Sequence, residues 1–536
     1  MTTFRSAMLG MAIAILVAGS LGSAAAADLA DNQILRKGNG AEPATLDPHK
    51  AEAVPDHNIL RDLLEGLVAE GPDGKLVPGA AASWDISADG TVYTFHLRPD
   101  GKWSNGEPVT AADFVYSLRR VVDPQTGSKY TFLLYPIKNA EEISKGQAAP
   151  DTLGAEAVDA ATLKLTLKAP TPYVLGLLTH GAAAPVHRAT VEKFGAQWVR
   201  AGNFVGNGAY TLKEWTPQSQ VVLAKSPTYW DAKTVKITEV TYFPTEDSNT
   251  DLKRYRASEV DMTNEVPNDQ LAFIKQNFPN EFKVAPYLGT YYYGFNMEQP
   301  PFKDNLKLRQ ALSLAIDRET LVEKVTAAGE LPAHSWVPPG VLDYHPQTPD
   351  TAKLSQAQRV EQAKKLYTEA GYSDAKPLSV EIRYNTNDNH KKIAIAIAAM
   401  WKQALGINAT LVNEEFKVFL ENRKQKKVTQ VFRAGWIGDY NDANTFAELL
   451  LSDAGLNDFG YNSAQYDALV KKAAVTIDSE KRAALMEEAE RVMLADQPMA
   501  PIYFYVVKRL VKPYVVNYQP TILNHNPTKW LAIAKH

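Results

Sequence analysis

The stretch Tyr287-Leu-Gly-Thr-Tyr-Tyr-Tyr-Gly-Phe-Asn296 has the aromatic composition of a β-strand and decides how the fold is interpreted. A second strand-like stretch, Ile502-Tyr-Phe-Tyr-Val-Val507, lies far along the chain. Each stretch lies at a position where the pattern of the surrounding sequence changes. Two strands that run from one lobe into another would form a hinge, whereas two central strands of one sheet would carry the same pattern. Both interpretations remain open on composition alone.

The rest of the chain mixes strand and helix patterns. Strand-type alternation occurs at 92–97 and 162–167, and two further segments, 210–215 and 221–223, predict a hairpin. Helical periodicity is clear from residue 304 onward and predicts four helices: 306–328, one from a Ser355–Gln358 capping box to about Gly371, 393–405, and 479–494. The chain is therefore predicted to have an α/β fold.

The first 27 residues have the pattern of a secretory signal peptide. Arg5 gives a basic start, Ala7 to Val17 form an apolar run, and small residues precede Asp28. The apolar run is too short to span a membrane, and no later stretch reaches 18 apolar residues. We expect residues 28–536 to be exported and soluble.

Cysteine is absent from the sequence, which excludes disulfides, thiolate metal sites and a lipid-modified N-terminal cysteine. Export without a lipid anchor indicates the periplasm of a Gram-negative bacterium. Without Arg5 the chain has 56 basic and 61 acidic side chains, a net charge of -5. There is no basic excess that would bind nucleic acid or an anionic membrane.

The length is too great for one core, so two or three domains are expected. The 24 tyrosines and 9 tryptophans occur partly in clusters. Clustered aromatic side chains suit a cleft that faces a ligand, although domain cores also contain them.

Signatures of catalysis are few. The ten histidines lack zinc-site spacing, no nucleophile elbow occurs, and Gly202 to Gly208 matches neither a phosphate loop nor a dinucleotide fingerprint. We expect no metal, no cofactor and no enzyme activity. A carboxylate pair of the kind that glycosidases use stays an open alternative, because the chain has many acidic residues.

The segment Arg433-Ala-Gly-Trp-Ile-Gly-Asp439-Tyr440-Asn441 is the strongest candidate for a binding site. It has too much charge for a core strand and too much aromatic surface for an ordinary loop. Its arginine and aspartate could hold a small molecule that carries both a negative and a positive end.

Long motifs in this chain are similar to those of one protein family. They are Leu46-Asp-Pro-His-Lys50, FHLRPDGKWSNGEPVTAADFVYS from Phe95, Asn207-Gly-Ala-Tyr210, GTYYYGFN from Gly289, YNTNDNHKKIAIAIA from Tyr384, RAGWIGDYN from Arg433 and RLVKP from Arg509. On these motifs, from about Ala30 to His536, the chain resembles the periplasmic peptide-binding proteins of bacterial ABC importers. The oligopeptide-binding and murein-peptide-binding branches of solute-binding protein family 5 share most of them.

The resemblance implies a type II clamp with two lobes built from three domains. The first domain would be discontinuous and comprise 28–65, 189–288 and 507–536. The second would span 66–188 and the third 289–506. The two strands quoted at the start fall on the crossings between the first and third domains, which favours the hinge.

The resemblance also implies a peptide-binding site. Asp439 would hold the α-amino group, although an aspartate here could instead cap a turn. Arg433, His390 and Arg423 would spread positive charge along the cleft for the carboxylate end, and Glu52 would offset Arg433 or Arg423 without ligand. His390 and Arg423 could alternatively be solvated helix residues.

Further residues would hold the peptide backbone and side chains. Ala53-Val54 and Gly435-Trp436-Ile437 would pair with the ligand backbone as added strands, with help near Tyr505. Side-chain pockets and hydroxyl donors would come from the residues Tyr130, Phe416, Asn385, Trp436, Tyr503 and Tyr505. Tyr503 could equally be a core residue.

The chain departs from the family pattern at several positions. A lysine that many oligopeptide binders carry is Thr326 here, and a tryptophan beside a pocket is Phe416. Gly289 and Ile437 occupy positions that are both cysteine in some relatives. The residue at position 52, a glutamate, resembles that of the general oligopeptide-binding branch. The strings Leu-Gly-Thr-Tyr-Tyr-Tyr and Gly-Asp-Tyr-Asn look closer to those of the murein-peptide-binding branch.

We therefore expect a monomeric periplasmic receptor that closes on short peptides, di- to pentapeptides, and delivers them to an inner-membrane ABC permease. Murein tripeptide is the alternative ligand. A secreted hydrolase is the alternative from another functional class.

Overall fold

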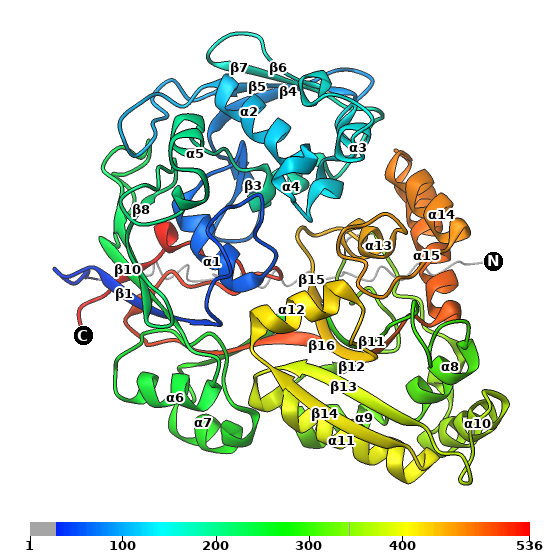
Figure 1. Cartoon of the computed structure of the whole chain (residues 1–536). Helices are drawn as coiled ribbons and strands as arrows, with labels where there is room; N and C mark the ends of the chain where they lie inside the picture. The colour runs from blue at the N-terminus through cyan, green and yellow to red at the C-terminus, as the bar shows by residue number, and fades with distance from the viewer. Residues whose placement is uncertain (1–27, 342) are drawn as a thin grey trace, which may run out of the picture.

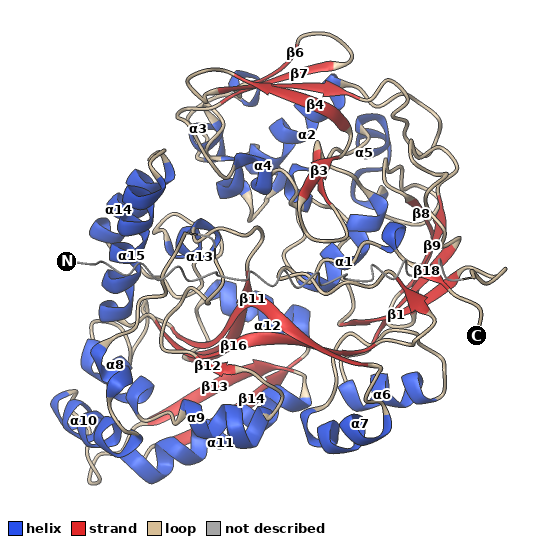
Figure 2. Cartoon of the chain, turned by 180° about the vertical axis from the view of Figure 1, so that it is seen from behind, coloured by secondary structure: helices blue, strands red, loops and turns tan. Residues whose placement is uncertain are grey.

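The computed structural model describes residues 28–341 and 343–536. The expected signal peptide, residues 1–27, lies outside the described residues. Three large sheets and two small ones carry the fold. In both views the sheet that contains residues 81–166 forms one edge of the molecule with its helices on the inner side, whereas the sheet that contains residues 379–414 has helices on its outer side (Figures 1 and 2).

The first large sheet has the order β1-β10-β9-β8. Its strands are β1 (Ile34–Gly40), β8 (Tyr210–Thr216), β9 (Gln220–Lys225) and β10 (Glu239–Pro244), and its helices are α1 (Val54–Leu63), α5 (Arg188–Phe194), α6 (Ser248–Arg256) and α7 (Leu271–Asn277). The pair β8 and β9 is antiparallel, which confirms the predicted hairpin. The C-terminal strands β17 (Val515–Val516) and β18 (Ala532–Ile533) form a small separate sheet.

The second large sheet has the order β4-β5-β7-β6 and is antiparallel throughout. Its elements are β4 (Ala81–Ile86), β5 (Val92–Leu97), β6 (Ala155–Ala157), β7 (Thr162–Thr166), α2 (Ala111–Val122), α3 (Ala140–Ser144) and α4 (Val174–Leu177), next to the small hairpin β2 (Val68–Glu70) and β3 (Leu76–Pro78). In β5 every second residue is buried, because one face of the strand packs on the core and the other meets solvent.

The third large sheet has the order β12-β16-β11-β15-β13-β14. Its strands are β11 (Phe282–Phe295), β12 (Leu331–Pro332), β13 (Ser379–Asn385), β14 (Asn408–Glu414), β15 (Val431–Ile437) and β16 (Met499–Leu510). Its helices are α8 (Leu306–Leu314), α9 (Arg318–Thr320), α10 (Gln356–Glu369), α11 (Asp388–Leu405), α12 (Phe416–Gln425), α13 (Asn444–Ala447), α14 (Ala464–Ala474) and α15 (Ser479–Asp496).

Local signals explain where these helices begin and end. Ser355 caps α10 as predicted, and Gly406 ends α11 with φ 69°. The predicted helix 306–328 is interrupted, because the side chain of Asp317 accepts the Thr320 N–H and starts a new helix. Helix α11 begins earlier than predicted, at Asp388, because the side chain of Asn387 caps it.

The strands β11 and β16 contain the two stretches that were quoted first, and their role as a hinge stays a prediction. They are neighbouring strands inside the third sheet, where Tyr291 pairs with Tyr503. Beyond a register shift they continue as a ribbon in which 282–286 pairs with 506–510, toward the first sheet. Figure 1 shows β16 running across the molecule in this way.

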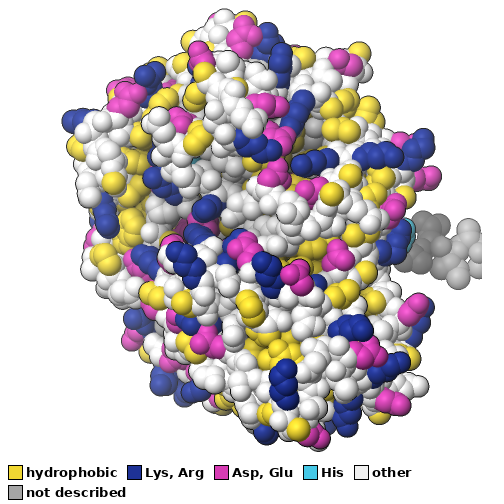
Figure 3. Space-filling view, turned by 45° about the vertical axis from the view of Figure 1, so that its right-hand side comes forward, with side chains coloured by type: hydrophobic (Ala, Val, Ile, Leu, Met, Phe, Trp, Pro, Cys, Tyr) yellow, Lys and Arg dark blue, Asp and Glu magenta, His cyan; other side chains and the backbone are white. Residues whose placement is uncertain are grey.

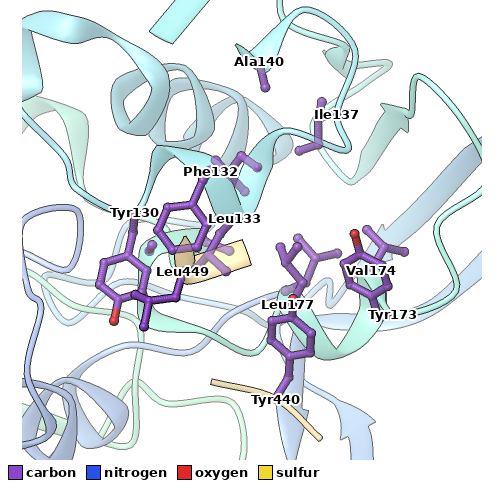
Figure 4. Close-up of a cluster of buried hydrophobic side chains, with 14 of the residues drawn as sticks. Tyr130, Phe132, Leu133, Ile137, Ala140, Tyr173, Val174, Leu177, Tyr440 and Leu449 are labelled. Atoms are coloured by element: carbon purple, nitrogen blue, oxygen red, sulfur yellow. The ribbon is translucent and has the colours of Figure 1, made fainter. Parts of the chain in front are cut away.

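One hydrophobic core is shared between the second sheet and one end of the third. It contains Phe132 and Leu177 on one side and Phe446 and Leu449 on the other. Figure 4 shows that Tyr440 and Leu449 lie against Tyr130, Leu177 and their neighbours. The two regions are therefore in direct apolar contact. In the part of the chain that the structure describes, no helix is long and apolar enough to cross a membrane.

Candidate functional site

A cavity of about 340 Å³ lies between the sheets and is lined by segments from across the chain. All fifteen residues that the sequence predicted for the site line it: Glu52, Ala53, Val54, Tyr130, Asn385, His390, Phe416, Arg423, Arg433, Gly435, Trp436, Ile437, Asp439, Tyr503 and Tyr505. On the face that Figure 3 shows, acidic and basic side chains are interspersed rather than gathered by sign.

Strand β15 presents one face to this cavity. Arg433, Gly435 and Ile437 are partly exposed, whereas Ala434 and Trp436 between them are buried. This follows from the two-residue period of a strand, which sends alternate side chains to opposite faces. Because Gly435 has no side chain, the phenol of Tyr505 can lie directly over it. We expected this glycine to admit a ligand backbone; in this structure the close neighbour is Tyr505.

The guanidinium of Arg433 is held by neutral partners. It donates to Asn385 Oδ1 at 3.1 Å and to the Tyr505 hydroxyl at 2.9 Å, and it lies 4.8 Å from the centre of the Tyr291 ring. Among the described residues no carboxylate lies within 4.0 Å of it. A buried cation without a counterion is a favourable place for a carboxylate.

Asp439 has the opposite character. Its Oδ1 lies 3.4 Å from His180 Nε2, and its Oδ2 is buried without a hydrogen-bond partner in the described part of the chain. Burial raises the pKa of Asp439 to about 7, although the positive charge of Arg61 acts against this rise. A desolvated carboxylate of this kind would be stabilised by an ammonium group.

His390 is the third residue of α11, so it lies at the N-terminal end of a helix, where the dipole favours anions. Its Nδ1 is buried without a partner among the described residues. Burial, together with the charges of Arg433 and Lys508, lowers the pKa of His390 well below its ordinary value. The ring is therefore neutral in this ligand-free structure, and the role of His390 at the carboxylate end of a peptide stays a prediction.

The ion pairs near Glu52 differ from the expectation. Glu52 pairs with Lys424 at 2.7 Å, and not with Arg433 or Arg423. Arg423 donates its Nε to Asp458 at 2.5 Å. Arg423 and Lys424, which are neighbours in α12, thus pair with different carboxylates.

The segment at Ala53 and Val54 is also different from a strand. Ala53 is extended, but Val54 is the first residue of α1. The carboxylate of Asp56 accepts the N–H groups of Glu52 and Ala53, each at 3.3 Å. Only Ala53 therefore keeps the extended backbone that pairing with a peptide requires.

The aromatic residues line different parts of the cavity. Tyr130 is buried and stacks on His180 with ring centres 4.6 Å apart. Trp436 donates its indole N–H to Thr445 O at 2.7 Å. Tyr503 is 5% exposed and stacks on Tyr291, so it belongs to a core cluster and also borders the cavity. Phe416 also lines the cavity, as do the apolar residues Phe419, Leu420, Leu449 and Leu456.

The departures from the family pattern have clear positions. Thr326 is buried and does not line the cavity. Gly289 and Ile437 are directly opposed on β11 and β15, and a Cβ at Gly289 would collide with the Ile437 side chain.

Sequence reasoning missed several polar lining residues, among them His57, Arg61, Glu265, Lys508 and His525. Arg61 is followed directly by Asp62, and Lys508 by Arg509, so neither residue stands out from its charged neighbour in the sequence. No group of three or more potential metal ligands is assembled within residues 28–341 and 343–536.

Comparison with known proteins gives consistent matches. Residues 75–458 match the family described as bacterial extracellular solute-binding proteins, family 5 middle. The chain is 45% identical to the periplasmic oligopeptide-binding protein OppA of Escherichia coli, over 100% of this chain and 99% of that protein. It is 41% identical to the periplasmic murein peptide-binding protein MppA of E. coli, over 90% or more of both.

Solved structures agree with these matches. The Haemophilus influenzae OppA complex with RPPGFSPFR has a TM-score of 0.92 at 41% identity, and 95% of this chain and 100% of that one are covered. The E. coli murein tripeptide-binding protein MppA has a TM-score of 0.92 at 39% identity, with the same coverage. The unliganded open form of MppA gives only 0.67, over 95% of this chain and 99% of that one. The predicted fold class, an α/β type II clamp, is thereby confirmed.

Proposed function

Since the chain belongs to the bacterial extracellular solute-binding proteins of family 5, we propose that it is a periplasmic receptor that captures short peptides and delivers them to an ABC permease. The relatives named above are periplasmic binding proteins for oligopeptides or murein peptides, which supports this assignment. We further propose that it binds its ligand without chemical conversion.

The observation that carries the proposal is the pair of unmatched charges in one cavity. Among the described side chains, neither Arg433 nor Asp439 has a partner of opposite charge within 4.0 Å. The histidine beside Asp439, His180, is neutral. The four residue steps from Arg433 to Ile437 in β15 span about 13 Å, and Asp439 lies two residues beyond the end of that strand. Allowing for the reach of both side chains, that span suits a zwitterionic chain of roughly three to five residues.

We propose the following division into domains: 28–65 with 189–288 and 507–536, then 66–188, then 289–506. It is supported by the sheets, because each large sheet is drawn almost entirely from one of these sets. The lower TM-score with the open form of the murein tripeptide receptor supports a hinged closure as part of the function. Closure would bury the peptide and present a new surface to the permease.

Calorimetry with three versions of one tripeptide tests the proposal. The free peptide should bind, and the N-acetylated version should lose about 3–5 kcal/mol, because it leaves Asp439 buried without a cation. The C-amidated version should be weakened at the other end, at Arg433. Equal affinities for the free and N-acetylated peptides would remove Asp439 from the site. Mass spectrometry of the recovered peptides should show intact ligand, whereas cleaved products would favour the hydrolase.

Murein tripeptide is a second candidate ligand, favoured by one observation. Arg423 lines the cavity, and Asp458 engages only its Nε, so its terminal nitrogens could meet an additional carboxylate. A thermal-shift comparison of L-tripeptides with murein tripeptide separates the two ligands. A larger shift with murein tripeptide that disappears in Arg423→Gln would establish the second.

A further inference from the structure

Three side chains from distant segments form a chain of hydrogen bonds beside Asp439. Arg61, in the last turn of α1, has its Nη2 2.7 Å from His525 Nε2. His525 Nδ1 lies 2.5 Å from Glu70 Oε2, at the end of β2. Both Arg61 and His525 line the cavity, and the side chains of His525 and Glu70 are largely buried.

The chemistry of the groups fixes the protons along this chain. A guanidinium only donates, so His525 Nε2 must accept from Arg61, and the ring proton then lies on Nδ1 and is donated to Glu70. Burial and the charge of Arg61 lower the pKa of His525, so the ring is neutral. Burial alone would raise the pKa of Glu70, but His525 and Arg61 more than offset this and lower it. Glu70 is therefore ionised, and its charge balances that of Arg61.

Asp439 lies close enough to feel the same arginine. The charge of Arg61 acts to lower the pKa of Asp439, yet no ion pair within 4.0 Å joins them in the described residues. The other groups around Asp439 supply no positive charge. Burial lowers the pKa of His57 to about 3 and that of His180 well below its ordinary range, and both rings are neutral.

We infer that Glu70 and His525 hold the Arg61 guanidinium away from Asp439 and balance its charge, so that the Asp439 carboxylate stays free for a ligand ammonium. This inference rests on the proposed function and extends it. After Glu70, Asp439 is the carboxylate that acts most strongly to raise the pKa of Arg61, so it would be the one available to Arg61 without Glu70. An internal ion pair would then compete with the amino end of the peptide. Glu70 and His525 are thus positioning residues, which act on the ligand through Arg61.

A double-mutant cycle tests this arrangement. Glu70→Gln should weaken binding of a free tripeptide at least about tenfold, since an opposite charge within 4–6 Å changes a carboxylate by one to three pKa units. Arg61→Gln in the same protein should restore the affinity to near wild type, because the competing cation is gone. A merely structural role for Glu70 predicts no such rescue. Unchanged affinity in Glu70→Gln, or no rescue in the double variant, overturns the inference.

Two further proteins make the result unambiguous. Glu65→Gln is the matched control. Glu65, like Glu70, is a buried carboxylate with a basic partner, in this case Lys529 at 2.7 Å, but Glu65 does not line the cavity. It should leave peptide affinity unchanged. If Glu70→Gln fails to fold, His525→Leu breaks the same chain at its middle and should weaken binding similarly.

A measurement without ligand separates this inference from the proposed function. Carbon-13 NMR of the Asp439 carboxyl should show a titration midpoint that falls by about one unit or more in Glu70→Gln. If wild type binds no peptide while the midpoint still falls, the proposed function fails and the Arg61 arrangement stands. If wild type binds free peptides but neither affinity nor midpoint responds, the function stands and the inference fails.

Discussion

The rings of Tyr173 and Tyr440 are stacked in parallel, with centres 5.6 Å apart and planes that differ by 1°. Arg482 lies 5.0 Å from the centre of the Tyr173 ring and forms an ion pair with Asp442 at 2.6 Å. Tyr173 belongs to the region of the second sheet, and Tyr440 follows β15 of the third (Figure 4). The stack therefore joins two regions that we propose move relative to each other.

Loss of this stack should favour the open form. Because an aromatic pair contributes about 0.5–1.5 kcal/mol beyond its buried area, Tyr173→Ala should weaken peptide binding roughly 3- to 10-fold. Small-angle scattering at subsaturating peptide should show a larger radius of gyration than wild type. Tyr372→Ala is the control, because it removes a stack with Tyr367 (ring centres 5.4 Å apart) inside one region. Equal scattering of the two variants would show that the Tyr173 stack does not hold the lobes together.

Asp439→Asn should raise the stability of the ligand-free protein and abolish peptide binding. The pKa of Asp439 in the fold is about 7, above the ordinary aspartate value of about 3.9. Its contribution to stability is therefore complete below pH 4 and is lost as the pH rises through 7. Above pH 7 the buried charge costs about 4 kcal/mol, which asparagine avoids. Thermal denaturation of the ligand-free protein at pH 8 should show a higher Tm for the variant, while calorimetry shows loss of peptide binding. A lower Tm would mean that the carboxylate is already paired.

The sequence predicted the α/β class, six of the strands (β5, β7, β8, β9, β11 and β16) and fifteen residues that line the cavity, because these depend on local pattern or on long family motifs. Strand β5 agrees with its predicted bounds, and the RAGWIGDYN motif carries both unmatched charges. The sequence analysis expected a strand-like segment at Ala53-Val54 and missed the start of α1 at Val54, although the sequence contains a local signal for it. Pro55 and Asp56 are typical of a helix start, and they outweigh the strand preference of a single valine.

Other features had no local signal at all. Glu52 meets Lys424 because α12 and the segment before α1 come together in the tertiary structure. Arg61, Glu70 and His525 are likewise joined only by folding, across 455 residues in the case of Glu70 and His525. Charge pairing between distant segments depends on geometry that composition and periodicity do not contain.

Peptide binding should weaken below pH 7. The ionised form of Asp439 is the form that holds an ammonium, and with a pKa of about 7 a proton increasingly occupies it at lower pH. The positive charge that acts on it is that of Arg61, and the neutral groups around it are His57, His180 and Tyr130. Glu448 also acts on Asp439, and burial raises the pKa of Glu448 well above its ordinary value. The dissociation constant should rise about tenfold per pH unit below pH 6, as for one coupled proton. Calorimetry from pH 5 to 8 measures this slope, and Asp439→Asn should lack it. A flat profile in wild type would place the amino group elsewhere.

Arg433 should bind the carboxylate end of the ligand. Arg433→Gln keeps a donor toward Asn385 and Tyr505 but removes the charge, so free tripeptides should bind about 2–5 kcal/mol more weakly. C-amidated peptides, which lack that charge, should bind wild type and variant alike, and the difference between the two ligands isolates the interaction. Arg309→Gln is the control, because Arg309 is a buried arginine that donates to backbone carbonyls outside the cavity. It should lower stability without changing the preference for a free carboxylate. If Arg433→Gln weakens the binding of free and C-amidated peptides equally, Arg433 supports the cavity wall and does not recognise the ligand carboxylate. The proposed orientation of the peptide would then rest on Asp439 alone.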